Sequence, residues 1–315
     1  MVKDFKTILG RARKLGPTTI AVAVAQDLDV LKAVNHACME GIINGILVGD
    51  RDEITVLANE IGMDLKKFEI LDVKDKEEAC RQAVLLVRDR KAGTLMNGFV
   101  DTSVILRAVL NKESGLAGGR LLSHVGVIQV EGYSRLLLIS DSAMNISPSL
   151  EEKVHIVENA VQVARALEID LPKVAMICAV EKVNPKMPAT VDAAEMVAMN
   201  QRGEIAGCIV GGPFALDIAV SEEAAGHKKI IHPVAGKADI LITPNLETGN
   251  VLNKSMEYFA RIEKAGIIMG VQAPIVLTSR ASSERSKLNS IALAVLVADH
   301  IQEASHGKNV PYTSH

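Results

Sequence analysis

Short apolar runs alternate with amphipathic segments through the first third of the chain. The apolar runs predict strands over 19–24, 43–48, 68–71 and 94–96. The amphipathic segments between them predict helices over 29–40, 52–62 and 75–88. Alternation at this spacing is typical of a largely parallel sheet with helices on both faces, so we predict an α/β fold.

The pattern changes in the middle of the chain. Two strand-like runs, 125–129 and 135–140, flank the polar turn Glu131–Ser134 and predict a hairpin. Ser149 is placed to cap a long amphipathic helix over 151–167. Alternation then resumes, with strands expected over 174–179, 208–210, 240–243 and 275–277 and helices near 190–200 and over 287–298.

The length of the chain, 315 residues, favours two domains. The best boundary lies near 141–148, with a return near 270–274. We therefore expect a first, discontinuous α/β domain of residues 1–146 plus 274–315 and a second α/β domain of residues 147–273. A cleft between two such domains is a common place for a ligand.

Composition narrows the choice of partners. A formal net charge of -3, 3% aromatic residues and no Trp give no basic surface or stacking platform, so we expect neither nucleic acid nor a membrane as partner. The four cysteines form no CxxC pair, and we find no signal peptide or membrane-spanning stretch. These features predict a cytoplasmic protein with reduced thiols and no zinc site.

The segment after the last predicted strand is the strongest candidate site. That strand delivers Thr278, Ser279 and Arg280 to its carboxyl end, just before a helix. Strand ends are where ligands bind in α/β sheets, and helix N–H groups together with a guanidinium favour a phosphate. In isolation a helix cap and a surface charge explain these residues equally well.

A second strand end, at Asn97 and Gly98, leads into a helix that carries Arg107. Arg107 is either an anion ligand or a member of a surface ion pair with Asp101 or Glu113.

Other candidates also have plain structural explanations. Asp141 and Asn145 follow a strand, where turn chemistry alone could place them. Asp217 is the lone carboxylate on an apolar helix that we expect Pro213 to begin, so it is either a buried, paired group or one that orients a substrate or Arg. Asn250 lies in a Gly-containing segment that could equally be a helix cap.

No metal site is predicted. Asp217, Asp239 and Glu247 could be combined as hard-metal ligands, but their spacing specifies nothing. The familiar nucleotide-binding, hydrolase and metalloprotease signatures are absent from the sequence.

Taken in chain order, four segments resemble the phosphate acetyltransferase and phosphate butyryltransferase family. They are 97–110, 140–148, 239–250 and 278–280. Two further segments, 211–217 and 287–293, are more similar to the butyryltransferase branch.

The resemblance implies a two-domain fold like that of isocitrate and isopropylmalate dehydrogenases, usually in a homo-oligomer of two or more chains. It implies reversible transfer of a short acyl group, butyryl or similar, between coenzyme A and inorganic phosphate by direct attack in a ternary complex. Acyl-CoA and phosphate would be substrates, with no tightly bound cofactor. By resemblance, Arg280 holds phosphate, Ser279 donates to the tetrahedral intermediate, and Arg107 helps to bind phosphate or coenzyme A. The other residues expected at the phosphate and coenzyme A site are Asn97, Gly98, Thr278, Asp141, Asn145, Asp217 and Asn250.

The sequence departs from the acetyltransferase pattern at the expected thiol base. That pattern has an Asp seven residues after the signature serine, where this chain has Ser286. Glu284 is the nearest carboxylate and is our candidate for the base. Two alternatives stay open: a non-catalytic protein that binds acyl-CoA or phosphate, and a metal-dependent decarboxylating dehydrogenase on the same fold.

Overall fold

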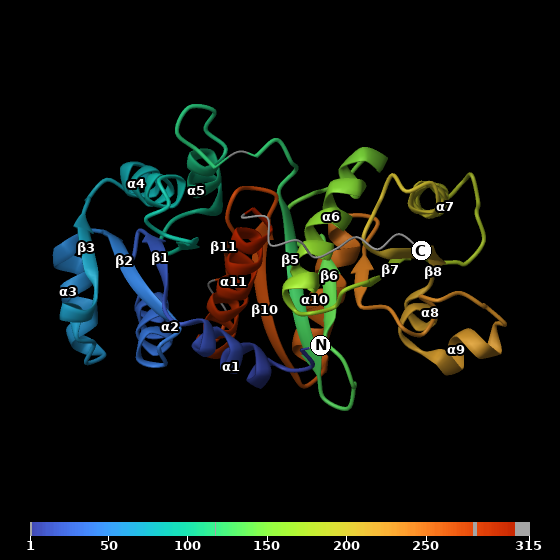
Figure 1. Ribbon diagram of the computed structural model, residues 1–315, viewed down its shortest axis with the longest axis horizontal. Coiled ribbons are helices and arrows are strands. Elements are labelled where there is room, and N and C mark those ends of the chain that lie inside the picture. Colours follow the sequence, from blue (N-terminus) through green and yellow to red (C-terminus); the bar gives the residue numbers. More distant parts are fainter. Residues whose placement is uncertain (1, 117, 280–281, 306–315) are drawn as a thin grey trace. The chain divides into compact units, whose positions relative to one another are not determined.

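The computed structural model describes residues 2–116, 118–279 and 282–305, which fall into two compact units (Figure 1). We call residues 9–116, 272–276 and 282–305 the terminal unit, and residues 2–8, 118–271 and 277–279 the central unit. In each unit, helices pack against a β-sheet.

The sheet of the terminal unit is parallel, with strand order β3-β2-β1-β4-β11. Its strands are β1 (Thr18–Ala23), β2 (Ile43–Gly49), β3 (Glu69–Asp72), β4 (Thr94–Asn97) and β11 (Ile275–Val276). The order reverses between β1 and β4, and such a reversal is the point where doubly wound sheets open a ligand crevice.

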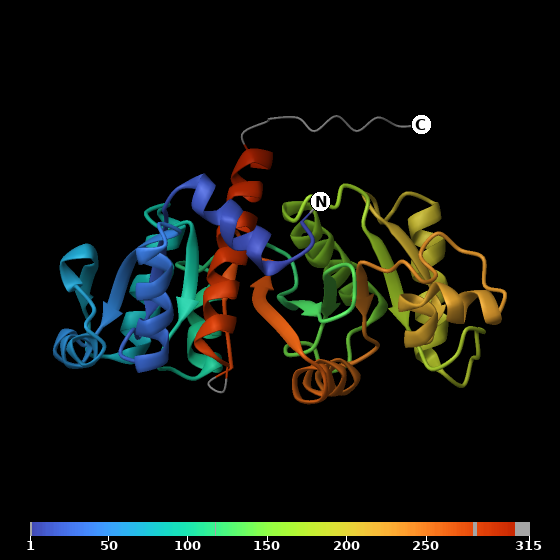
Figure 2. The same ribbon diagram turned by 90° about the horizontal axis from the view of Figure 1, so that it is seen from below.

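The helices of this unit include those predicted from the sequence. They are α2 (Leu28–Met39), α3 (Arg51–Glu60), α4 (Lys76–Arg88), α5 (Thr102–Val109) and α11 (Glu284–Ser305), with a short 3-10 turn η1 (Leu65–Lys67), and α1 (Phe5–Leu15) leads into β1. Asp27, Asp50 and Asp75 each accept hydrogen bonds from first-turn N–H groups of the helix that follows, which explains where these helices begin. The long α11 packs along β11, β4 and α2 (Figure 2).

The central unit has a mixed sheet with strand order β10-β5-β6-β9-β7-β8. Its strands are β5 (Ser123–Val130), β6 (Leu137–Ser140), β7 (Lys173–Ile177), β8 (Ile209–Phe214), β9 (Ile240–Ile242) and β10 (Ile262–Met269). The predicted hairpin is confirmed: β5 pairs antiparallel with β6, and also with β10, whereas β6, β9, β7 and β8 run parallel.

The helices of the central unit are α6 (Leu150–Ala166), α7 (Pro188–Gln201), α8 (Leu216–Val220), α9 (Glu222–His227) and α10 (Leu246–Phe259). Ser149 caps α6 in a reciprocal capping box with Glu152. The prediction that Ser149 caps this helix is confirmed. One cluster of its core gathers side chains from β5, β6, β7, β9 and α8, among them Ile128, Ile139, Leu241 and Ile218.

Two expectations about the chain's organisation differ from the structure. Residues 118–146 lie in the central unit, not with the terminal segments, because β5 and β6 pair with β10 and β9. Pro213 does not begin a helix: it lies inside β8, and α8 starts three residues later at Leu216.

The structure has four free cysteines, and three of them are buried. In the ranges that the structure describes, no helix is both long and apolar enough to span a membrane.

Candidate active site

At the carboxyl edge of the terminal sheet, β1 and β4 end side by side, with Ala23 opposite Asn97. Gly98 packs directly on the end of β1: its N–H donates to the Ala23 carbonyl at 2.9 Å. A Cβ on Gly98 would lie 2.2 Å from the Val24 carbonyl oxygen, so only glycine fits there. Gly98, predicted at the ligand site, is therefore explained by the packing of two strand ends.

Val24 is a buried, β-branched residue with a positive φ of 53°. Such residues rarely adopt the left-handed region, and strained backbone of this kind collects at functional sites. The strain lies at the strand end that borders the reversal of strand order.

Two buried acceptors at the same edge have no hydrogen-bond partner among the described residues. Asn97 donates through Nδ2 to the Val100 carbonyl at 3.3 Å, but its Oδ1 is unpaired. Gln26, only 7% exposed, has an unpaired Oε1 that lies against Gly49. A buried acceptor left unpaired costs ~1–3 kcal/mol, so both oxygens suit a ligand that donates N–H or O–H groups. Gln26 is not predicted from the sequence, because no local pattern marks it as buried.

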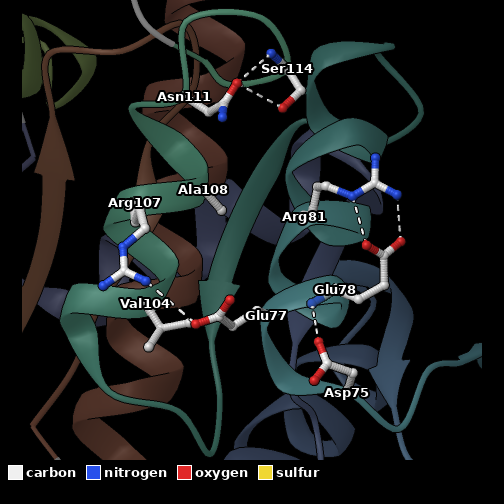
Figure 3. Close-up of a pocket in the computed structure, with 9 residues that line it drawn as sticks. All are labelled: Asp75, Glu77, Glu78, Arg81, Val104, Arg107, Ala108, Asn111 and Ser114. Atoms are coloured by element: carbon white, nitrogen blue, oxygen red, sulfur yellow. Dashed lines mark hydrogen bonds and ion pairs between the residues drawn. The ribbon is translucent and has the colours of Figure 1, made fainter.

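Arg107 lies at a surface pocket of about 330 Å³ between α4 and α5 (Figure 3). Its Nη1 is 3.4 Å from the Glu77 carboxylate, and both side chains are more than 70% exposed. The surface ion pair was one of the two predicted explanations, although its partner is Glu77 and not Asp101 or Glu113. An exposed pair of this kind contributes little, so it leaves the guanidinium able to turn to an anion.

The rest of this pocket is not built for phosphate. Its other guanidinium, that of Arg81, is held by both oxygens of Glu78 at 2.6 and 2.7 Å, which lowers the pKa of Glu78 to about 2 (Figure 3). Asp75 and Glu77 add two more carboxylates to the lining. With three acids against two bases, the pocket itself does not attract anions.

The signature segment follows β11. Thr278 is half-buried and Ser279 is exposed, whereas Arg280 lies outside the described residues. The helix cap of α11 is Ser283, whose Oγ accepts from the Ser286 N–H at 3.2 Å. Since Ser283 has this role, the alternative explanation of Ser279 as the helix cap is wrong.

Glu284, the candidate thiol base, is the first residue of α11 and contacts a histidine from α2. Its Oε1 lies 2.9 Å from Nδ1 of His36, and both side chains are nearly half-exposed. His36 is not predicted from the sequence as a site residue. A carboxylate and an imidazole in hydrogen-bond contact can share and pass a proton.

In the central unit, Asp141 organises the loop after β6. The buried carboxylate accepts from the N–H groups of Ala143 and Met144 through Oδ1. Its Oδ2 accepts from Asn145 Nδ2 at 2.6 Å and from the His124 N–H at 3.2 Å. Four donors occupy this carboxylate, so the geometry favours the turn explanation of Asp141 and Asn145 over direct ligand binding.

The same loop is held from two other sides. Asn250, at the start of α10, donates to the Ser142 carbonyl at 3.3 Å, and a Cβ on Gly249 would lie 2.3 Å from the Asp141 carbonyl. Gly249 thus lets α10 approach the loop closely.

His124, on β5, contacts Ser142 Oγ through Nδ1 at 3.1 Å. Desolvation lowers the pKa of His124, against the opposing effect of Asp141, so the ring is neutral near pH 7.

Asp217 is not the buried carboxylate that one explanation expected. Its side chain is 53% exposed and lies 3.5 Å from the ammonium of Lys228. Asp239 instead accepts from the Lys173 N–H at 2.9 Å and pairs with Arg135. In the part of the chain that the structure describes, no three His, Cys, Asp or Glu side chains are grouped to hold a metal ion.

Comparison with known proteins gives matches over most of the chain. The family model for phosphate acetyl/butaryl transferase matches residues 5–82 and 77–295. The chain is 52% identical over 298 residues to the phosphate butyryltransferase of Clostridium acetobutylicum. The alignment covers 95% of this chain and 99% of the relative.

Solved structures with a similar fold include a phosphotransacylase. The branched-chain phosphotransacylase from Enterococcus faecalis V583 matches with a TM-score of 0.80 and 34% identity, over 90% of this chain and 99% of that chain. The 4-hydroxythreonine-4-phosphate dehydrogenase from Klebsiella pneumoniae matches with a TM-score of 0.54 and 13% identity, over 89% of this chain and 99% of that one. This second likeness concerns the fold alone.

The fold is therefore the α/β fold of phosphotransacylases, and the predicted α/β class is confirmed. The family model and the 52% identical relative both match nearly the whole chain, so they identify the family within this fold class. The chain belongs to the phosphate acetyl/butaryl transferase family, and the resemblance seen in the four segments is confirmed.

Proposed function

We propose that this chain transfers a short acyl group, butyryl or a similar one, between coenzyme A and inorganic phosphate, with residues 278–280 at the centre of the reaction. The observation that carries the proposal is the signature Thr278-Ser279-Arg280 in the sequence between β11 and α11, in a chain 52% identical to a phosphate butyryltransferase. Strand end and helix start together favour an anionic substrate.

The reaction needs an anion clamp and an oxyanion donor. A phosphate oxygen attacks the thioester carbonyl carbon, and the C–O bond forms as the carbonyl electrons move onto oxygen. The tetrahedral oxyanion then collapses, the C–S bond breaks, and acyl phosphate and the coenzyme A thiolate leave. In this scheme Arg280 holds the phosphate and Ser279 donates to the oxyanion. A single donor of this kind is typically worth ~10²–10³ in rate.

Coenzyme A brings two kinds of group to the protein. Its amide and amino N–H groups match the unpaired acceptors of Gln26 and Asn97. Its phosphates match Arg107, whose present partner, Glu77, is an exposed and weakly held one.

The thiol proton is assigned to Glu284, assisted by His36. In the direction of acyl-CoA synthesis, the thiol gives its proton to the Glu284 carboxylate, and His36 stabilises that carboxylate through the 2.9 Å contact. Because Ser286 cannot replace an Asp as base, this pair supplies the missing function.

We also expect a homo-oligomer. Along α10, Val251, Tyr258 and Phe259 are 64%, 72% and 90% exposed. Val251 and Tyr258 are seven residues apart and share a helix face, and an exposed apolar face of this kind suits contact with a second copy of the chain.

The first test is phosphate-dependent release of coenzyme A thiol from acetyl-, butyryl- and isobutyryl-CoA. Release that requires phosphate supports acyl transfer, and the order of kcat/KM sets the preferred chain. Each methylene changes binding by only ~1–3 kcal/mol, or roughly 10- to 200-fold in kcat/KM, and the effects of the two carbons that separate acetyl from the larger groups multiply. Binding of coenzyme A with no release from any thioester would instead identify a binding protein, and nicotinamide reduction would identify a dehydrogenase.

A further inference from the structure

The pocket between α4 and α5 contains two guanidinium groups with very different partners (Figure 3). Arg81 donates through Nε and Nη2 to the two carboxylate oxygens of Glu78, at 2.7 and 2.6 Å. Gln82 donates to the same carboxylate at 2.7 Å. By contrast, Nη1 of Arg107 approaches Oε1 of Glu77 only to 3.4 Å. The pocket therefore has one firmly held guanidinium and one that is loosely held.

The contact between Arg107 and Glu77 is weak enough to be exchanged for a ligand. Charge-assisted hydrogen bonds of a guanidinium are typically ~2.7–2.9 Å long, and this contact is longer. Both side chains are more than 70% exposed, so water and salt screen their attraction. A phosphate group carries more negative charge and can accept two parallel bonds from the same guanidinium. Arg107 can therefore leave Glu77 for a phosphate.

We propose that Glu77 competes with the substrate for Arg107 and so lowers the affinity of the protein for a phosphate group of that substrate. A carboxylate beside a guanidinium reduces the positive potential that an arriving anion meets. Glu77 acts through Arg107 and is a positioning residue. The inference rests on the proposed function, in which Arg107 binds an anionic substrate. Coenzyme A and inorganic phosphate share this chemistry, and the experiment measures them separately.

The neighbouring residue in the sequence provides a matched control. Glu77 and Glu78 both lie in the first turn of α4, so Glu77→Gln and Glu78→Gln remove the same charge from the same end of one helix. Only Glu77→Gln removes the carboxylate that contacts Arg107, because Glu78 is the partner of Arg81. A difference between the two variants therefore reports the contact to Arg107 and not the total charge of the pocket.

The measurement is thiol release at low ionic strength, with KM determined in turn for acyl-CoA and for phosphate. Exposed ion pairs contribute little, so Glu77→Gln should lower one of these KM values by ~2- to 5-fold. A lower KM for acyl-CoA identifies a phosphate of coenzyme A as the ligand of Arg107, and a lower KM for phosphate identifies inorganic phosphate. The kcat of Glu77→Gln should be unchanged, since its role is in binding alone. Glu78→Gln should keep both wild-type KM values.

Two further readouts connect the effect to the guanidinium of Arg107. Arg107→Met should raise the same KM, and adding Glu77→Gln to that variant should bring no gain, because the competing pair no longer exists. In about 1 M NaCl, the KM values of the wild type and of Glu77→Gln should converge, because salt screens an exposed pair.

Four results would overturn the inference. Unchanged KM values in Glu77→Gln would show that no competition exists, and a raised KM would show that Glu77 orients Arg107 for binding. An equal gain in Glu78→Gln, or a gain that persists in the Arg107→Met background, would assign the effect to the general charge of the pocket.

Calorimetric titration with coenzyme A and with phosphate makes the test independent of turnover. The Kd values should follow the same order as the KM values across the wild type, Glu77→Gln and Glu78→Gln. If they do so in a protein that releases no thiol from any acyl-CoA, acyl transfer is refuted and the competition between Glu77 and the ligand stands. Thiol release with Kd values that do not differ between the variants would leave acyl transfer standing and refute the competition.

Discussion

At the residue scale, a polar side chain can stabilise the fold or bind a ligand. Its hydrogen-bond partners show which of the two roles it has. The Asp141 carboxylate is occupied by four donors from its own loop and from β5, whereas Gln26 and Asn97 each keep a buried acceptor without a partner. From the sequence, Asp141 was the better ligand candidate and Gln26 was not noticed. The difference arises from contacts that strand pairing creates, and no local pattern encodes it.

Substitution of Asp141 by Ala should reduce stability. The N–H groups of Ala143 and Met144 would lose their acceptor, and a hydrogen bond to a charged group contributes ~1.5–3 kcal/mol. We expect the free energy of unfolding to fall by about 2–5 kcal/mol in urea titrations. The exposed Asp217, changed to Ala, should shift it by less than ~0.5 kcal/mol. Wild-type stability in Asp141→Ala, with only the substrate KM raised, would restore Asp141 as a ligand.

His124 should make stability depend on pH. Desolvation lowers its folded pKa below the unfolded value of ~6.5, so the unfolded chain binds more protons in this range. Its contribution is complete above ~pH 6.5 and is lost as the pH falls below that value towards the folded pKa. The free energy of unfolding should therefore drop between pH 7 and pH 5.

Substitution of His124 by Gln should remove up to ~1.4 kcal/mol per pH unit of that slope, measured by urea titration at several pH values. The pKa of His232 is also lowered by desolvation, so His232 should still contribute to the pH dependence of stability in this variant. The same substitution at the exposed His227 is the control. An unchanged slope in His124→Gln would show that the ring does not titrate with folding.

At the scale of elements, the sequence predicted the strands and helices well because apolar periodicity and Asp or Ser caps are local signals. It failed at β8, where Pro213 suggested the start of a helix. A Cβ on Gly211 would lie 2.6 Å from His232, and one on Gly212 would lie 2.9 Å from Met176. These glycines make room for neighbours within a strand, and those neighbours are distant in sequence.

The contact between α2 and α11 is the other feature that the sequence could not supply. His36 and Glu284 are 248 residues apart and meet only because the two helices pack together. If they act as a pair on the thiol proton, Glu284→Gln should lower kcat by ~10²–10⁴-fold at neutral pH.

His36→Gln should lower kcat less than Glu284→Gln does, because the carboxylate itself remains. The measurement is the pH–rate profile of acyl-CoA synthesis from acyl phosphate and coenzyme A. The exposed pair Arg202 and Glu195 offers a control in Glu195→Gln, which should leave the profile unchanged. A wild-type profile in Glu284→Gln would remove this residue from the mechanism.

At the scale of the whole molecule, the sequence predicted two α/β units but grouped residues 118–146 with the terminal segments. Apolar runs identify a strand without identifying its neighbour, and only the pairing of β5 with β10 and of β6 with β9 assigns this stretch to the central unit. The sequence is equally unable to show which apolar residues remain exposed on the surface. Phe259 reads as one more apolar residue in the sequence, yet it is 90% exposed.

This exposure leads to a prediction about assembly. If a second copy of the chain covers the α10 face, Phe259→Ser should shift the protein towards the monomer in sedimentation velocity at micromolar concentrations. Burying a large aromatic side chain is worth ~1.5–3 kcal/mol per copy, so a two-fold contact that buries it twice would weaken by ~10²–10⁴-fold in Kd. Ile231→Ser, at a residue that is 99% exposed outside any helix or strand, should leave the sedimentation coefficient unchanged. A monomeric wild type would refute the oligomer, and an oligomer that Phe259→Ser leaves intact would place its interface away from α10.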